Sequence, residues 1–588
     1  MGRIVGIDLG TTYSAVGYLS ADGPRLIPNA IGDLLTPSAV GIDTDGKVLV
    51  GRPAKEFQVV QPERCVSTFK RHMGTDWTAE IAGRRYSPEE LSSLVLRTLK
   101  GDAEAHLGET VDRAVITVPA YFNEHQRKAT LRAGRIAGFE VERILNEPTA
   151  AAIAYGLHDG RQEKVLVVFD LGGGTFDVSV VDLFEGTLEV RASSGETFLG
   201  GEDFTNAMAA RIVESRGYVF ERAETEHPRL ISRLRLECEQ AKLRLSSRPE
   251  TAVRFPDKKG EFDADSPLVA VTRAQFESWT EHILNRMELP IRRALGDAGL
   301  GRDDVDELIL VGGATRMPFV AERVTQLFGR SPTCRLNPDE VVALGAAVQS
   351  GLIEKNAAVE DLVVTDVSPF TLGIEISPDI GGIKRRGYFL PIINRNTTIP
   401  VSRVERVLTT APNMASVRIA VYQGEGRRVA SNLFLGEFTV DGIPLGPVGR
   451  PIDVRFTYDL NGVLEVEAVV VETRKKVTHV ITRHAREMSE ADVAKAVAAM
   501  HALKTHPREE TVNRFLLRRA ERVYQELPLP LRRLLEQLIL GFEEALEIRD
   551  PAVIQRHKAS LQEFLTLHDR GTTDGRDSEN EGADDDPH

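Results

Sequence analysis

Hydrophobic and polar positions alternate in short runs over much of the chain, and two pairs of these runs flank similar turns. The apolar runs 4–7 and 165–169 have strand character, and after a turn each is followed by a second run, 14–19 and 176–181. Two such runs joined by a short glycine-containing turn are typical of a β-hairpin. The pattern therefore predicts two hairpins, one near the start of the chain and one in its middle.

Both predicted turns carry an aspartate followed by glycine and threonine. They are Asp8-Leu9-Gly10-Thr11-Thr12 and Asp170-Leu171-Gly172-Gly173-Gly174-Thr175. Glycine lets a turn backbone approach a phosphate, and the N–H groups of such a turn form an anion-binding nest. An aspartate at the strand end suits a hydrated divalent cation that neutralises the phosphates. One such turn is most often purely structural, whereas two copies with the aspartate in the same place indicate the two sides of a nucleotide site.

The first 367 residues predict an α/β domain followed by a linker. Residues 1–358 mix strands with helical stretches such as 126–137, which is typical of α/β proteins. Residues 359–367 include the unusually apolar segment Asp361-Leu362-Val363-Val364-Thr365-Asp366-Val367. This segment is expected to be an interdomain linker, although an ordinary strand has the same pattern.

In the rest of the chain, the spacing of apolar residues changes its period twice. Residues 368–484 alternate with period two and contain the turn signals Asp441-Gly442 and Asn461-Gly462, which predict a small all-β domain. From Ser489, which forms a capping box with Asp492, helical periodicity predicts a helical domain over 485–569. Its clearest helical patterns are 515–527, 531–548 and 551–567. The acidic residues 570–588 contain almost nothing apolar and are expected to be a disordered tail.

Composition and charge narrow the class of protein. The chain has 588 residues, 42% of them hydrophobic, and a formal net charge of −14, which argues against nucleic acid or an anionic membrane surface as the main partner. Three cysteines without metal-ligand spacing indicate a reducing compartment. No apolar run of about eighteen residues and no secretory signal are found, so a cytoplasmic protein that acts on proteins or small molecules is expected.

Longer motifs resemble one family over residues 3–568, the DnaK-type heat-shock chaperones of the Hsp70 family. Its motifs occur here in the family's order: Val118-Pro119-Ala120-Tyr121-Phe122, Asn146-Glu147-Pro148-Thr149-Ala150, Gly200-Gly201-Glu202-Asp203-Phe204, Gly312-Gly313-Ala314-Thr315-Arg316, Asn396-Thr397-Thr398-Ile399-Pro400 and Tyr422-Gln423-Gly424-Glu425. Residues 400–405 and 90–94 most resemble the specialised bacterial branch called HscC.

This resemblance implies an actin-like (ribonuclease H-like) ATPase domain, a β-sandwich peptide-binding domain and a helical lid. The ATPase domain would bind ATP or ADP with Mg²⁺, and K⁺ is a further candidate ion. Asp8 and Asp170 would hold the magnesium through water, and Lys70, Glu147 and Thr175 would take part in catalysis. The remaining nucleotide contacts would come from Gly10, Thr11, Thr12, Tyr13, Gly172, Gly173, Gly174, Gly200, Gly201, Glu239, Lys242, Ser246, Gly312, Gly313 and Arg316. Glu239, Lys242 and Ser246 share one helical face by their spacing, which is also typical of an ordinary solvated stripe.

The same resemblance implies how the domains communicate. Extended apolar segments of unfolded client proteins would bind at Val407, Thr410, Val417 and Ile419, although alternation alone also fits the inner face of a sheet. Interdomain coupling would involve Pro119, Arg127, Leu362, Val363, Val364 and Asp366, and a J-domain co-chaperone would bind near Arg143, Asn146 and Asp366. A nucleotide exchange factor is a further candidate partner, and a mostly monomeric protein is expected.

Three functions remain open at this point. The first is a specialised ATP-dependent chaperone with few clients, the second is a general housekeeping foldase, and the third is a small-molecule kinase of the actin-like fold. Several extra residues within 376–395, including the basic run Lys384-Arg385-Arg386, and Thr410 in place of a small residue favour the first. The kinase leaves residues 368–568 without a role.

Overall fold

The computed structural model describes residues 2–159, 163–184, 187–263, 265–354, 363–380, 383–459, 464–480, 508–527, 529–548 and 551–568. The chain forms two compact units. The first contains Met1–Ser38, Ser67–Asp203 and Glu281–Leu503, and the second contains Ala39–Val66, Phe204–Thr280 and Lys504–His588.

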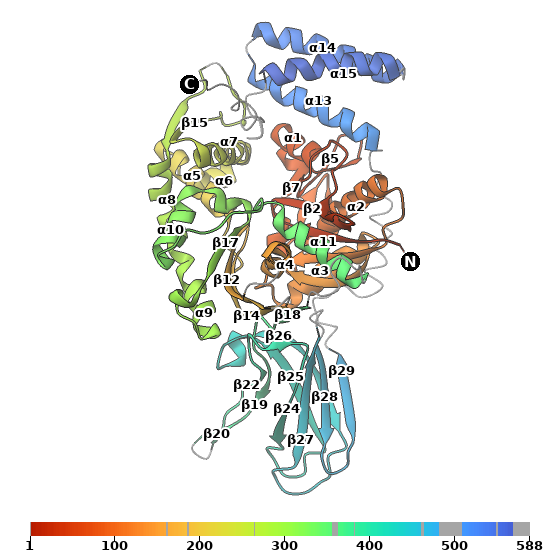
Figure 1. Cartoon of the computed structure of the whole chain (residues 1–588), viewed down its shortest axis with the longest axis vertical. Helices are drawn as coiled ribbons and strands as arrows, with labels where there is room; N and C mark the ends of the chain where they lie inside the picture. The colour runs from red at the N-terminus through yellow and green to blue at the C-terminus, as the bar shows by residue number, and fades with distance from the viewer. Residues whose placement is uncertain are drawn as a thin grey trace, which may run out of the picture. The chain divides into compact units, whose positions relative to one another are not determined.

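Two mixed sheets form the centre of the first unit (Figure 1). The first has the order β11-β10-β1-β2-β3, with β4 paired to β2, and the second has the order β17-β12-β13-β14-β18-β23. The strands of the first sheet are β1 (Ile4–Leu9), β2 (Tyr13–Ser20), β3 (Gly23–Leu26), β4 (Thr36–Pro37), β10 (Arg113–Val118) and β11 (Glu140–Asn146). Those of the second are β12 (Lys164–Leu171), β13 (Phe176–Phe184), β14 (Thr187–Glu196), β17 (Glu307–Val311), β18 (Val363–Val367) and β23 (Thr398–Ile399).

The two sheets repeat the same arrangement. In each, three successive strands run antiparallel, and the first of the three also pairs in parallel with a later strand, β1 with β10 and β12 with β17. The predicted hairpins are confirmed, because Leu9 pairs with Ser14 and Leu171 pairs with Phe176 across the two turns. A doubled arrangement places the two aspartate-glycine turns at equivalent positions.

Two helices of small residues pack closely within this core. They are α4 (Glu147–Asp159) and α11 (Val341–Ile353), and a Cβ atom at Gly345 of α11 would overlap the Ala150 carbonyl of α4. Residues of both helices and of both sheets belong to one buried cluster, which includes Ile4 and Val168. The remaining helices of eight or more residues that lie wholly within this unit's described part are α2 (Pro88–Leu107), α3 (Glu124–Ile136), α9 (Glu288–Ala298) and α10 (Pro318–Phe328).

The predicted all-β domain also lies in the first unit and consists of two antiparallel four-stranded sheets around one apolar core. One sheet has the order β22-β19-β25-β26 and the other β24-β27-β28-β29. Their bounds are β19 (Leu372–Ile376), β22 (Tyr388–Ile393), β24 (Val401–Leu408), β25 (Ser416–Gln423), β26 (Leu433–Asp441), β27 (Pro451–Tyr458), β28 (Leu464–Val470) and β29 (Lys476–Val480). The extra residues after β19 form a small hairpin of β20 (Asp379–Ile380) and β21 (Ile383–Lys384).

The second unit combines part of the predicted ATPase domain with the C-terminal helices. Its described elements are β5 (Ala39–Ile42), β6 (Val48–Val50), α1 (Arg52–Val60), α6 (Phe220–Glu226), α7 (Pro228–Ser247), β15 (Glu250–Arg254), β16 (Leu268–Thr272), α13 (Arg508–Glu526), α14 (Leu529–Ile548) and α15 (Pro551–His568). The boundary between the units falls inside α5 (Gly201–Ser215) and α8 (Arg273–Arg286). The three helical patterns predicted after residue 510 are confirmed, whereas the predicted helix start at Ser489, the Asn461-Gly462 turn and the acidic tail lie outside the described residues.

Helix α13 groups with residues 39–66 because it packs on α1. Arg522 of α13 and Glu56 of α1 form an ion pair of 2.5 Å in which both side chains are less than a tenth exposed. The guanidinium of Arg518 lies 4.6 Å from the ring centre of Phe57. The two compact units therefore differ from the predicted domains, because the packing of α13 on α1 joins a C-terminal helix to residues 39–66.

The fold class is confirmed as a multidomain arrangement of α/β, all-β and helical parts. Within the ranges that the structure describes, none of the helices combines the length and the apolar character that crossing a membrane requires.

Candidate functional site

The two aspartate-glycine turns face each other in the first unit. A Cβ atom added at Gly173 would overlap the Thr12 hydroxyl, and one added at Gly174 would lie 2.9 Å from Thr11 Oγ1. Glycine at these two positions therefore permits the approach of the turns. Sequence reasoning assigned the turns to opposite sides of a nucleotide, and the structure brings their tips into contact distance.

A third glycine segment, at the start of α5, packs on the second turn. Gly201 N–H donates to the Gly172 carbonyl at 2.9 Å, and Glu202 N–H donates to the Gly173 carbonyl at 2.9 Å. A Cβ atom at Gly200 would lie 2.5 Å from Gly174 N. Gly10, Thr11, Thr12, Gly172, Gly173, Gly174, Thr175, Gly200 and Gly201 are thus parts of one local arrangement, and Tyr13 beside it is 45% exposed.

Carboxylates outnumber cations beside these turns. Lys70 is 3% exposed, and its ammonium donates to Glu147 Oε1 at 2.6 Å. Burial raises the pKa of Asp8 and of Asp170, and the negative charge of Glu147 raises both further, while Lys70 opposes the shift. Burial likewise raises the pKa of Asp177 to about 8. A local excess of negative charge of this kind favours the binding of a cation.

The donor set suits a cation that keeps its water shell. Among the described residues, no three His, Cys, Asp or Glu side chains gather closely enough to ligate a metal directly. Asp8 accepts a hydrogen bond from the Thr117 hydroxyl at 2.9 Å, which fixes one of its oxygens. Hard cations such as Mg²⁺ usually retain several waters and need only one or two protein carboxylates.

The predicted adenosine segment follows β17. Gly312 has a φ of 84°, and a Cβ atom there would lie 2.9 Å from Asp170 Oδ1. Gly313 begins a short 3-10 turn that ends at Arg316, whose side chain is 47% exposed and pairs with Asp339 at 2.8 Å. This segment therefore lies directly beside the second aspartate turn.

Glu239, Lys242 and Ser246 lie on α7 in the second unit and share one face of it, as predicted. Lys242 pairs with Glu239 at 2.7 Å and donates to the Thr205 hydroxyl at 3.0 Å, and Ser246 Oγ donates to the Lys242 carbonyl at 3.3 Å. Burial alone would raise the pKa of Glu239, but Lys242 and Thr205 together hold it below its usual value. Because Lys242 is 6% exposed, this face is not an ordinary solvated stripe.

A hydrogen-bond network joins the site to the predicted linker. Arg127 donates to the Asn146 side-chain oxygen at 2.6 Å and to the carbonyl of Ala120, which follows Pro119. Asn146 Nδ2 donates to both oxygens of Asp366, at 2.9 and 2.8 Å. Glu147, the partner of Lys70, directly follows Asn146 in the sequence. These contacts therefore connect the Lys70–Glu147 pair to the linker.

The described part of the linker is β18, a strand that pairs with both β14 and β23. In β18, Val363, Val364 and Thr365 pair in parallel with Thr187–Glu189 of β14, and Asp366 and Val367 pair with β23. Val363 is 55% exposed, whereas Val364 packs against the buried core. Leu362, the other residue predicted to couple the domains, lies outside the described residues.

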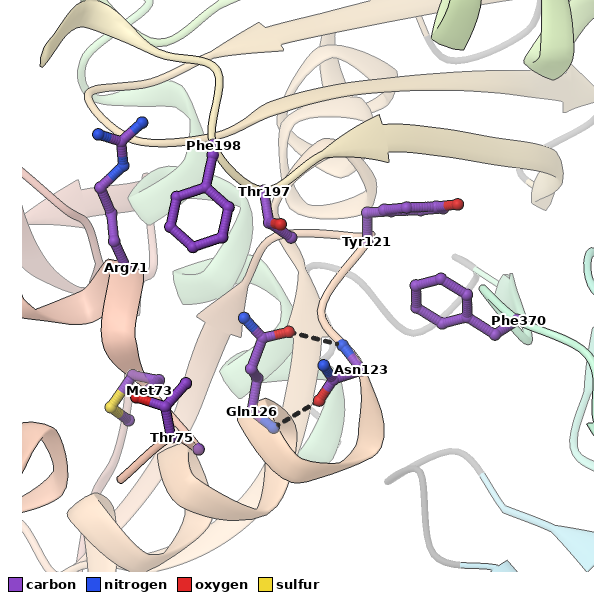
Figure 2. Close-up of a pocket in the computed structure, with 10 residues that line it drawn as sticks. Arg71, Met73, Thr75, Tyr121, Asn123, Gln126, Thr197, Phe198 and Phe370 are labelled. Atoms are coloured by element: carbon purple, nitrogen blue, oxygen red, sulfur yellow. Dashed lines mark hydrogen bonds between the residues drawn. The ribbon is translucent and has the colours of Figure 1, made fainter. Parts of the chain in front are cut away.

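Side chains of the β-sandwich also contact the predicted ATPase domain directly. Gln423 accepts a hydrogen bond from the Glu124 N–H at 3.0 Å, and Arg395 pairs with Asp297 at 2.8 Å. A pocket of about 240 Å³ lies at this junction (Figure 2), and the ring centres of Tyr121 and Phe370, which line it, are 4.4 Å apart. The pocket is lined by Arg71, Met73, Gly74, Thr75, Tyr121, Asn123, Gln126, Thr197, Phe198 and Phe370.

The residues expected to contact peptide lie in or beside the core of the β-sandwich. Ile419 is 3% exposed in that core, and Val407 and Val417 are partly buried against it. Thr410 is half-buried, with its hydroxyl 3.8 Å from the sulfur of Met414. Val407, Val417 and Ile419 thus lie on the inner surface, which fits both interpretations that the sequence left open, a peptide pocket and the inner face of a sheet.

Sequence reasoning missed a clamp around the second turn. Arg71 Nε donates to the Gly174 carbonyl at 3.1 Å, and its terminal nitrogen pairs with Asp203 at 2.5 Å. Asp203 also accepts from Gly200 N–H at 2.8 Å. Their positions in the sequence could have indicated these two residues, because Arg71 follows Lys70 and Asp203 follows the Gly200-Gly201 pair.

Comparison with known proteins agrees with this architecture. A family profile described as "Hsp70 protein" matches residues 4–538. The "Chaperone protein DnaK" of Thermosipho melanesiensis is 40% identical over 599 residues, which cover 97% of this chain and 98% of that protein. The "Chaperone protein DnaK" of Thermotoga neapolitana is 43% identical over 510 residues, which cover 84% of this chain and 82% of that protein.

The fold and the family match together define an ATP-dependent chaperone. The chain belongs to the Hsp70 family and resembles its DnaK type. It is therefore an ATP-dependent molecular chaperone and an ATPase that binds ATP or ADP and unfolded client polypeptides. Similarity to Hsp70 proteins over most of the chain does not fit the alternative of a small-molecule kinase.

Proposed function

We propose that ATP binds between the two aspartate-glycine turns and that the residues around them hydrolyse it. Gly10, Thr11, Thr12 and Tyr13 would contact the phosphates from one side, and Gly172–Thr175 with Gly200 and Gly201 from the other. In the first unit, the adenosine would contact Gly312, Gly313 and Arg316. The observation that carries this proposal is the contact of the two turns beside the buried Lys70–Glu147 pair.

Little covalent help from the protein is needed for this reaction. Phosphoryl transfer to water has a charge-dispersed transition state, so positioning and electrostatic stabilisation dominate. Lys70 would stabilise charge on the transferred phosphoryl group, and Glu147 would orient the attacking water. Thr175 and the backbone N–H groups of the turns would donate hydrogen bonds to phosphate oxygens. Bound Mg²⁺, held through water by Asp8 and Asp170, would neutralise phosphate charge, and K⁺ is a further candidate ion.

We infer that nucleotide state sets peptide affinity through β18. Pro119, Arg127, Asn146 and Asp366 would relay the state of the site, since their hydrogen bonds form a continuous path. ATP would favour docking of the linker, including Leu362, Val363 and Val364, and would open the peptide site. Bound peptide would in turn promote hydrolysis, because coupling between two sites is reciprocal.

The partners and the branch within the family form a second level of this proposal. A J-domain co-chaperone would bind near Arg143, Asn146 and Asp366, and a nucleotide exchange factor is a further candidate. The extra β20–β21 hairpin and Thr410 favour a specialised chaperone with few clients over a general foldase. The resemblance of residues 400–405 and 90–94 suggests the HscC branch for this chain. Val407, Thr410, Val417 and Ile419 would line its peptide cleft. We expect a mostly monomeric protein of the cytoplasm.

The decisive experiment measures the affinity of the full chain for fluorescent unfolded peptides, first with ADP and then with ATP. Marked weakening and faster release with ATP are expected. The Gly173→Ala variant should lose this response, because its Cβ would overlap Thr12. Gly101→Ala is a matched control, since no atom lies within 4 Å of a Cβ placed at Gly101. Equal peptide affinity in both nucleotide states of the unmodified chain would refute the coupling.

A further inference from the structure

Four arginines gather where the extra hairpin of the β-sandwich meets the loop between β25 and β26. Arg385 and Arg386 lie between β21 and β22, and Arg427 and Arg428 lie in that loop. We refer to these four residues as the arginine patch. All four are exposed.

The backbone holds the two halves of the arginine patch together. Phe389 N–H donates to the Arg427 carbonyl at 3.1 Å, and Val429 N–H donates to the Gly387 carbonyl at 3.1 Å. Arg428 Nη1 donates to the Arg386 carbonyl at 3.2 Å. The patch is thus built from paired backbone and is not a chance approach of mobile side chains.

Tyr388 fixes two of the four guanidinium groups. The guanidinium carbon of Arg428 lies 3.7 Å from the centre of the Tyr388 ring, and that of Arg427 lies 5.5 Å from it. An aromatic face attracts a guanidinium group through its quadrupole, and stacking reduces the rotamer freedom lost on binding a ligand. The side chains of Arg427 and Arg428 are therefore partly preorganised for binding a ligand.

The arginine patch lacks carboxylate partners among the described residues, as do Arg403, Arg455 and Arg474 elsewhere in the β-sandwich. Within the described ranges, Arg395, Arg406 and Arg450 each form an ion pair, whereas none involves Arg385, Arg386, Arg427 or Arg428. The whole chain carries a net charge of −14, so a cluster of four unpaired arginines is opposite in sign to the net charge of the chain. A cluster of guanidinium groups is suited to carboxylates, which it can bind through two parallel hydrogen bonds.

Glu375 of β19 contacts both the segment that carries the arginine patch and the neighbouring strand β25. It accepts a hydrogen bond from Gly387 N–H at 3.2 Å and pairs with Arg418 at 3.4 Å. Arg418 lies between Val417 and Ile419 on β25, and β19 separates β25 from β22. Two strand spacings amount to about 10 Å, which an extended peptide spans in about three residues.

We propose that the arginine patch binds acidic residues that flank the apolar segment of a client polypeptide. The chain then selects apolar segments with aspartate or glutamate about three positions from the apolar centre. This inference rests on the proposed peptide-binding function and specifies the clients that it takes. Acidic flanking residues would find charged donors in the patch, whereas lysine or arginine would be repelled.

The test compares three fluorescent peptides that share one apolar core and differ in their flanking residues, which are aspartate, serine or lysine. With the full chain in ADP and at low salt, the aspartate peptide should bind about three- to tenfold tighter than the serine peptide, as expected for a few exposed ion pairs. The advantage should shrink as salt screens it. It should disappear in the R385S/R386S and R427S/R428S variants and persist in Arg455→Ser, an exposed arginine of the other sheet.

Each other result overturns the assignment. If the serine peptide binds and is released by ATP but aspartate brings no advantage, the arginine patch does not select clients, although the proposed function stands. If the preference appears only after removal of residues 570–588, which carry seven Asp or Glu, the patch is occupied by the chain's own acidic segment and does not select clients in the full chain. If no peptide binds in either nucleotide state, the proposed peptide-binding function itself fails.

Discussion

Asp366 is the residue whose removal tests most directly how the linker is held on the ATPase sheet. Its carboxylate is 6% exposed and accepts hydrogen bonds from Asn146 Nδ2 at 2.9 and 2.8 Å and from the Thr149 hydroxyl at 3.2 Å. It also accepts from the backbone N–H of Val367 at 2.8 Å. The Asp366→Ala variant would remove the acceptor and leave these buried donors without a partner.

The size of the effect follows from these contacts. A hydrogen bond to a charged group contributes about 1.5–3 kcal/mol, and a buried donor left unpaired costs about 1–3 kcal/mol. Burial of the carboxylate offsets part of this, since it raises the pKa of Asp366 above its usual value. We therefore expect linker docking to weaken by about 2–4 kcal/mol, or about 30- to 1,000-fold in the docking equilibrium.

Hydrogen exchange of the β18 amides in the presence of ATP measures this change. Asp366→Ala should lose protection across Val363–Val367, and ATP should no longer accelerate peptide release. Asp453→Ala is the control, because Asp453 pairs with Arg406 on the outer surface of the β-sandwich. There the expected loss is below about 1 kcal/mol. Unchanged β18 protection in Asp366→Ala, together with normal release by ATP, would refute the proposed relay.

Three further predictions concern other buried charges. Lys70→Met should slow ATP hydrolysis about 100-fold, because the transferred phosphoryl group loses the cation that would stabilise its charge; an unchanged steady-state rate would contradict the proposed catalytic role. Arg522→Met should expose the α13 amides to exchange, since it leaves Glu56 buried and unpaired at a cost of about 3–5 kcal/mol; the double variant that also carries Glu56→Met should restore protection, and equal exchange in all three proteins would contradict this. Asp177 has a folded-state pKa of about 8, so the native protein holds a proton that the unfolded chain releases above pH 4, and stability falls as pH rises toward 8. Asp177→Asn should therefore flatten this decline by up to about 1.4 kcal/mol per pH unit, measured by urea unfolding without nucleotide; identical pH profiles would show that this carboxyl does not titrate there.

Local patterns were sufficient to predict the repeated core. The runs around Asp8 and Asp170 have the length and alternation of strands, and a glycine turn leaves a hairpin as the simplest connection. The alternation around Ile419 and the helical periodicity around Leu535 were equally informative, because burial on one face imposes period two on strands and 3.6 on helices. Both residues lie in buried cores.

Contacts between distant residues could not be predicted in the same way. Lys70 and Glu147 are 77 positions apart, and Glu124 and Gln423 are 299 positions apart. No periodicity links such pairs, since they depend on how whole elements pack. The ion pair of Arg522 with Glu56 has the same origin, and it groups a C-terminal helix with residues 39–66. The stack of Arg428 on Tyr388 likewise required the fold of the extra hairpin.

The pairing of β18 with β14 also determines what the ATPase sheet presents to its surroundings. β18 covers the hydrogen-bonding edge of Thr187–Glu189 and thereby ends the row of ATPase strands in that sheet. Whenever β18 leaves, this edge is open, and an open edge is where a strand from another chain can add. Release of the linker thus creates the same hazard of strand addition that a chaperone limits in its clients. Self-association of this protein is therefore expected to depend on nucleotide state.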